Sequence, residues 1–140
     1  MHTFTMALRS GIALVAVLAA TAASAADSAA GRQVFRDRCV LCHSAEAGDN
    51  GGGQGPSLAH AYGRQAGSNP AFPFTPALRS SGLRWDAATL DRFLADPGSV
   101  VPGSLMVLAV PDAAERANLV AYLQSVDSIA APSVAAAPAP

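Results

Sequence analysis

Apolar residues recur at helical spacing in three stretches of the chain, and no stretch shows the sustained alternation of β-branched residues that predicts a strand. The first helix is expected over residues 27–38 with Asp27 as its cap. The second is expected over residues 86–96 with Asp86 as its cap, and Pro97 prevents its continuation. The third follows Asp112, which begins a capping-box pattern. Its apolar stripe consists of Leu119, Tyr122, Leu123 and Val126. These patterns predict an all-α fold.

Long irregular segments separate these helices. Residues 45–55 contain five glycines and predict a flexible surface loop. Thr75 followed by Pro76 is a favourable start for a short helix, which Gly82 would end. Such connections are uncommon in a small domain, and a large buried prosthetic group would give them a surface to pack on. We therefore expect four to five short helices wrapped around one bound group.

The two ends of the chain differ in composition from the rest. Residues 1–25 place His2 and Arg9 before an apolar stretch and finish with small residues, which predicts a secretory signal peptide; a retained membrane anchor is the weaker alternative. Residues 129–140 are dominated by alanine and proline and predict a disordered tail. The folded domain should therefore comprise residues 26–128 and be exported to the periplasm.

The amount and distribution of charge argue against nucleic acids as partners. Without the predicted leader the chain has eight arginines against ten acidic residues, a formal charge of about −2, and it contains no lysine. The arginines are spread along the chain, so nothing resembles the basic footprint of a nucleic-acid-binding protein.

The strongest chemical signal is Cys39-Val40-Leu41-Cys42-His43, a C-x-x-C-H motif in which two thiols add to haem vinyl groups and the next imidazole reaches the iron. One helical turn puts both sulfurs on the same side of the haem edge. A structural zinc site would need four nitrogen or sulfur ligands, and beyond the predicted leader only His60 could join these three residues. A thioredoxin-like redox pair of cysteines would need a βαβ context, which the sequence pattern does not show. The motif predicts one covalently bound haem c.

Met106 is the candidate for the second axial position. It is the only methionine beyond the predicted leader, and it follows a Pro-Gly turn about 60 residues after His43, where a separate loop can close over the opposite haem face. A lone methionine is more often a core residue, and iron can also carry a second histidine or an open position. His60 is close to His43 in sequence and is expected to be a surface or hydrogen-bonding histidine. We expect His43 and Met106 to be the iron ligands.

With these residues placed, the chain resembles the class I cytochromes c over nearly all of residues 31–126. The resemblance implies that glycine at position 31 lets the first helix cross the last one closely. The positions that match the two crossing helices are Gly31, Phe35, Leu119 and Tyr122.

The same resemblance implies roles around the haem. The Pro56 carbonyl would accept a hydrogen bond from His43, and Arg64 and Trp85 would serve the haem propionates. Trp85 as plain core and Arg64 as an ordinary solvated side chain are the alternatives. The chain departs from the family at Phe74 and Phe93, where tyrosine is frequent, at Leu78, where asparagine is common, and in lacking the lysines by which many relatives dock.

The function implied is that of a periplasmic one-electron carrier rather than an enzyme, a monomer without a small-molecule substrate. Its partners would be redox proteins, namely an oxidase, a reductase or a dehydrogenase, and a role as a subunit associated with one such enzyme stays open. The alternative is a haem enzyme or gas-binding haem protein with a labile sixth ligand. That alternative predicts high-spin iron and easy CO binding, whereas the carrier predicts low-spin iron.

Overall fold

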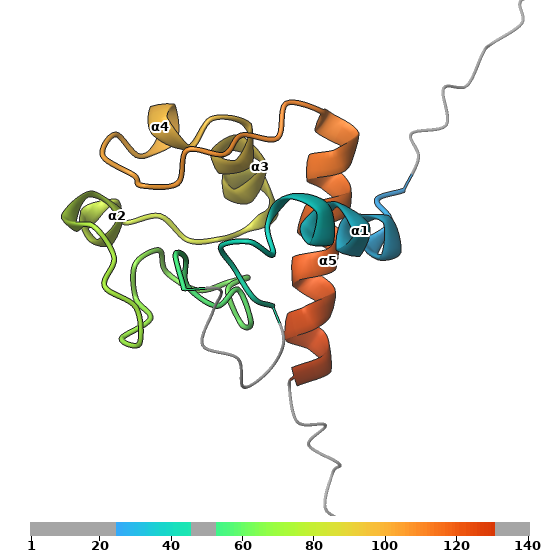
Figure 1. Ribbon diagram of the computed structural model, residues 1–140, viewed down its shortest axis with the longest axis horizontal. Helices are drawn as coiled ribbons and strands as arrows, with labels where there is room; N and C mark the ends of the chain where they lie inside the picture. The colour runs from blue at the N-terminus through green and yellow to red at the C-terminus, as the bar shows by residue number, and fades with distance from the viewer. Residues whose placement is uncertain (1–24, 46–52, 131–140) are drawn as a thin grey trace, which may run out of the picture.

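The computed structural model describes residues 25–45 and 53–130, with side chains as far as residue 127. These residues contain five helices and no strand, so the all-α prediction is confirmed. The helices are α1 (Ser28–Arg38), α2 (Pro76–Ser80), α3 (Ala87–Ala95), α4 (Pro97–Val100) and α5 (Ala113–Ala130) (Figure 1). The predicted leader, apart from residue 25, and part of the glycine-rich loop lie outside the described residues. The expected tail lies there as well, except for residues 129 and 130, which belong to α5.

Side chains that were recognised as helix caps begin the helices. The Asp27 carboxylate accepts the N–H of Ala29 at 2.8 Å before α1. The other caps are Thr75 before α2, Asp86 before α3 and Asp112 before α5, each accepting an N–H from the residue three positions on. Local hydrogen bonding thus determines where the helices start.

Helix α4 was not expected. Pro97 ends α3, as predicted, but it is also the first residue of α4, where a missing N–H costs nothing. Asp96 serves both helices, because it ends α3 and its carboxylate accepts the N–H of Ser99 at 3.1 Å.

Helices α1 and α5 cross in close contact at one side of the domain (Figure 1). A Cβ atom at Gly31 would lie 2.9 Å from the backbone nitrogen of Leu119 and closer still to the Asn118 carbonyl, so only glycine fits this crossing. Beside it the rings of Phe35 and Tyr122 pack with centroids 5.5 Å apart. The buried cluster around this crossing also contains Cys39, and this places the start of the cysteine motif in the core.

The remaining helices extend the core to one side. Helix α3 packs on α5 through Leu90 and Leu94, which are buried in the same cluster. The Arg116 guanidinium of α5 donates to Asp91 of α3 at 2.7 Å and to the Pro111 carbonyl at 2.7 Å. Helix α2 lies apart, joined to the rest by the long segments on either side of it (Figure 1). No helix in the described part of the chain combines the length and apolar character needed to span a membrane.

Candidate functional site

The cysteine motif forms a tight turn directly after α1. The N–H groups of Cys42 and His43 donate to the Cys39 carbonyl at 3.0 and 2.8 Å, so the chain makes one further turn before it leaves the helix direction. Cys39 is buried, whereas Cys42 is partly accessible. Both are free thiols. The turn therefore presents two unlinked sulfurs and an imidazole from five consecutive residues.

The environment of Cys39 bears on the alternatives to haem attachment. Burial raises the pKa of its thiol to about 11, although Arg38 acts in the opposite direction. The group is therefore held as the neutral thiol, whereas the thiolate is the form that attacks a disulfide. Within residues 25–45 and 53–130, no three side chains among His, Cys, Asp and Glu converge as a metal site.

His43 is held from two sides. Its Nδ1 lies 2.8 Å from the Pro56 carbonyl oxygen, and since a carbonyl only accepts, Nδ1 carries the proton and donates it. In a neutral ring, Nε2 is then the atom with a lone pair for a metal. Gly55 lies against the ring: a Cβ atom there would be 2.7 Å from Nδ1 and nearer still to Cε1. The Gly55 N–H also donates to the Cys42 carbonyl at 2.8 Å.

Arg64 and Trp85 are neighbours although they lie far apart in sequence. The backbone N–H of Trp85 donates to the Arg64 carbonyl at 2.9 Å, and the backbone N–H of Gly63 donates to the Trp85 carbonyl at 2.8 Å. The indole packs against the Phe93 ring with centroids 4.9 Å apart. Both side chains are half-buried. The backbone pairing places next to each other the two residues that were predicted to serve the propionates.

Met106 reaches the same core as the cysteine motif. Its N–H donates to Ser104 Oγ at 3.2 Å, and the Ser104 N–H donates to the Val101 carbonyl at 2.9 Å, which shapes the turn before it. The side chain is half-buried and packs against the cluster that contains Cys39. Two motifs more than half the domain apart in sequence therefore converge on one apolar cluster.

Apolar side chains next to both motifs test whether a haem fits here. Leu41, within the cysteine motif, is 79% exposed, and Leu105 and Val107, on either side of Met106, are 83% and 91% exposed. Val40 and Leu108 are exposed as well. Large exposed aliphatic side chains next to the predicted ligands are what a flat apolar group would cover. With two free thiols, an oriented imidazole and a thioether, the residues present fit a covalently bound haem.

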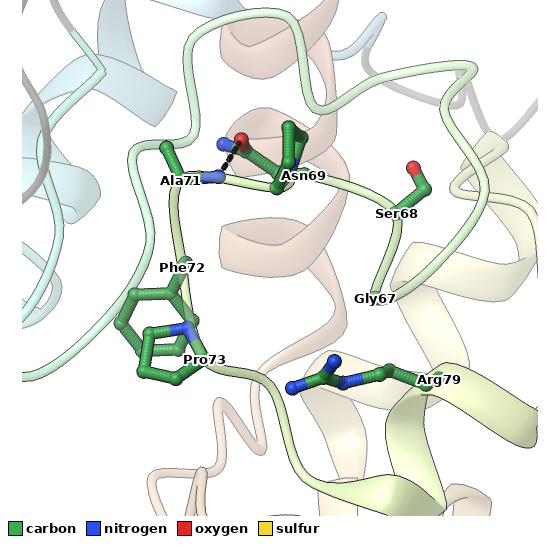
Figure 2. A pocket seen from close by; sticks show the side chains of 8 residues that line it. Gly67, Ser68, Asn69, Ala71, Phe72, Pro73 and Arg79 are labelled. Atoms are coloured by element: carbon green, nitrogen blue, oxygen red, sulfur yellow. Dashed lines mark hydrogen bonds between the residues drawn. The ribbon is translucent and has the colours of Figure 1, made fainter.

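A pocket of about 400 Å³ lies elsewhere, between residues 67–73 and α2 (Figure 2). The Arg79 guanidinium points toward this loop, and its Nε and Nη2 donate to the Phe74 carbonyl at 3.0 and 2.9 Å. The Ala71 N–H donates to Asn69 Oδ1 at 3.0 Å (Figure 2). None of the residues that line this pocket is among the predicted site residues.

Sequence reasoning missed the contact between Gly55 and the His43 ring. Gly55 was recognised only as the residue before Pro56, in a glycine-rich stretch that reads as a flexible loop. The signal available was its position beside the proline whose carbonyl faces His43, but glycine content alone does not distinguish a tight contact from a flexible segment.

Comparisons with known proteins agree with this reading. A family model described as Cytochrome c matches residues 28–127. Cytochrome c2 iso-2 of Magnetospirillum fulvum is 50% identical over 88 residues, which cover 62% of this chain and 90% of that protein. Cytochrome c2 of Rhodomicrobium vannielii is 40% identical over 109 residues, which cover 76% of this chain and 85% of that protein.

Among solved structures, cytochrome cH from Methylobacterium extorquens superimposes with a TM-score of 0.63 and 38% sequence identity, covering 71% of this chain and 98% of that one. The resemblance noted in the sequence and the expected fold are confirmed. The chain belongs to the cytochrome c family, and its cofactor is one covalently attached haem c.

Proposed function

We propose that this member of the cytochrome c family, a monohaem electron carrier, works in the periplasm as a shuttle between respiratory or dehydrogenase partners. Its haem would be linked through Cys39 and Cys42 and ligated by His43 and Met106. The observation that carries the proposal is the convergence of Met106 and Cys39 on one apolar cluster, with the His43 ring oriented by its hydrogen bond to the Pro56 carbonyl.

Bound haem supplies a one-electron Fe(III)/Fe(II) couple. The fold preorganises His43, the predicted iron ligand, because the hydrogen bond to Pro56 restricts its tautomer and the contact with Gly55 restricts the rotation of its ring. Arg64 and Trp85 supply N–H donors suited to propionate carboxylates. These residues would hold and orient the haem, and none of them needs to exchange a proton during electron transfer.

Sulfur ligation and apolar burial set the direction of the reduction potential. A thioether donates little charge, and exposed aliphatic side chains such as Leu41 and Leu105 would shield a bound haem from water, so both would favour the less charged Fe(II) state. His43 and Met106 would hold the iron through an imidazole and a thioether, and with both bound no substrate would reach it. A role as carrier rather than enzyme follows from that ligation.

This protein must recognise its partners by a surface other than the lysines through which many of its relatives dock. The chain has none, and its formal charge after loss of the predicted leader is about −2. We propose redox protein partners that meet the apolar residues beside the ligands in brief, small contacts, with the carrier itself a monomer. The predicted leader over residues 1–25 supports periplasmic delivery.

The test is replacement of Met106 in the purified holoprotein. The oxidised parent should be low-spin with a weak long-wavelength sulfur-to-iron band. Met106→Ala should abolish that band, open the iron to CO in the reduced form and lower the reduction potential. Val107→Ala, which changes an exposed neighbour, is the matched control and should keep the parent spectrum. An M106A spectrum identical to that of the parent would refute methionine ligation, and CO binding by the parent at neutral pH would favour a gas-binding haem protein.

A further inference from the structure

A carboxylate near the end of α5 is buried against the segment that leads to Arg64. The Asp127 side chain is 17% exposed, and Oδ1 lies 3.8 Å from His60 Nδ1. The backbone N–H groups of Tyr62 and His60 lie close enough to influence the carboxylate, yet neither of its oxygens is accessible to solvent or makes a hydrogen bond of full geometry. Arg64 is the other charged group that acts on it.

This arrangement is unfavourable to the fold. Burial raises the pKa of Asp127 above its ordinary value, despite the opposing effects of the Tyr62 and His60 N–H groups and of the His60 and Arg64 charges. A carboxyl group with a raised folded-state pKa binds its proton more tightly when folded, so its ionised form lowers stability as the pH rises through that pKa. His60 adds to the cost, because its φ of 59° is unusual for a residue other than glycine. Stability does not explain this cluster.

The cluster is connected to the predicted redox centre through a short path. Arg64 is paired with Trp85 by backbone hydrogen bonds, and these two residues are the donors suited to haem propionates. An ionised Asp127 offsets part of the Arg64 charge, and a protonated Asp127 does not. Because Fe(III) haem carries one more positive charge than Fe(II) haem, any net positive charge gained nearby favours the reduced state.

We propose that Asp127, beside His60, forms a proton-binding site that acts on the redox centre through Arg64, so that proton uptake by its carboxylate raises the reduction potential of the haem. On reduction, one electron comes from the redox partner and the proton comes from solvent to the Asp127 carboxylate. The inference rests on the proposed function in placing a haem beside Arg64 and Trp85. It does not depend on which residue is the sixth ligand.

The experiment measures reduction potential from acid to neutral pH on purified holoprotein of the parent and three variants. Asp127→Asn removes the charge with little change of shape, and it should raise the potential at neutral pH and flatten its pH dependence. Asp37→Asn removes an equal charge from an exposed site on α1 and should shift the potential much less. His60→Asn tolerates positive φ but removes the side chain that lowers the pKa of Asp127, so the pH dependence should move to higher pH.

Thermal unfolding separates this role from a merely structural one. D127N should melt at the parent temperature or above it at neutral pH, because it removes a charge that burial disfavours. A D127N protein that melts lower and keeps the parent potential at every pH overturns the proposal, as does a D127N shift no larger than that of D37N. If D127N yields no holoprotein, the H60N variant provides the test. An H60N plot of reduction potential against pH that coincides with that of the parent overturns the proposal. Spectra of the parent would reveal failure of methionine ligation separately.

Discussion

Replacing Gly55 by alanine tests how the proximal histidine is held. The backbone at Gly55 does not require positive φ, so the only obstacle is space. The new methyl carbon would lie 2.7 Å from His43 Nδ1 and 2.9 Å from the Cys42 carbonyl oxygen, and closer still to Cε1. Ordinary contacts need about 3.5 Å, so the ring must move by roughly 1 Å.

The energy follows from two effects. Overpacking in a close-packed site costs about 1–3 kcal/mol. The bond of 2.8 Å between Nδ1 and the Pro56 carbonyl would be lost or badly distorted, since a separation near 3.6 Å is no longer a hydrogen bond. Losing it removes about 0.5–1.5 kcal/mol. Together these predict a loss of roughly 2–4 kcal/mol, which for a domain of this size lowers the melting temperature by roughly 10 °C or more.

The assay compares G55A with Gly98→Ala in thermal unfolding and in the ligand-field spectrum of the oxidised holoprotein. A Cβ at Gly98 meets nothing nearer than Asp96 Oδ1 at 3.7 Å, so G98A controls for the exchange of glycine for alanine without crowding. G55A should melt well below G98A and show altered iron ligation, because the imidazole has been displaced. If G55A melts with G98A and keeps the parent spectrum, the contact between Gly55 and the ring does not exist.

Two further predictions concern the scaffold. Gly31→Ala should lower the unfolding free energy by about 2 kcal/mol or more, because the methyl group meets the backbone of α5 at residues 118 and 119; a chemical denaturation midpoint equal to that of the parent would show that the helices do not cross in backbone contact. Asp86 caps α3, and its hydrogen bonds with Thr89 lower its pKa from 3.8, so its contribution is complete above that pH and is lost as pH falls through the lowered value. Asp86→Ala should therefore melt below the parent at neutral pH, with the difference shrinking in acid, and Asp86→Asn, which can still cap, should melt closer to the parent. Melting curves across the acid range check this, and a D86A difference that persists in strong acid would contradict it.

Features that depend on neighbouring residues were readable from the sequence. Asp27, Thr75 and Asp86 cap their helices because a side-chain oxygen reaches an N–H two or three residues on, whatever the rest of the chain does. The spacing of Cys39, Cys42 and His43 is likewise local, since one turn of backbone fixes it. The resemblance to the cytochromes c also supplied the crossing at Gly31.

Contacts between distant segments were decided by the tertiary structure. Sequence pattern alone gave no reason for His60 to meet Asp127, because the pairing depends on how α5 passes the loop before Arg64. The closeness of Gly55 to the His43 ring depends in the same way on the path of the glycine-rich segment. Hydrophobic periodicity indicates which face of a helix is buried, but not which residues pack against that face. The tertiary contacts decide the partners of each side chain, and those partners determine its pKa.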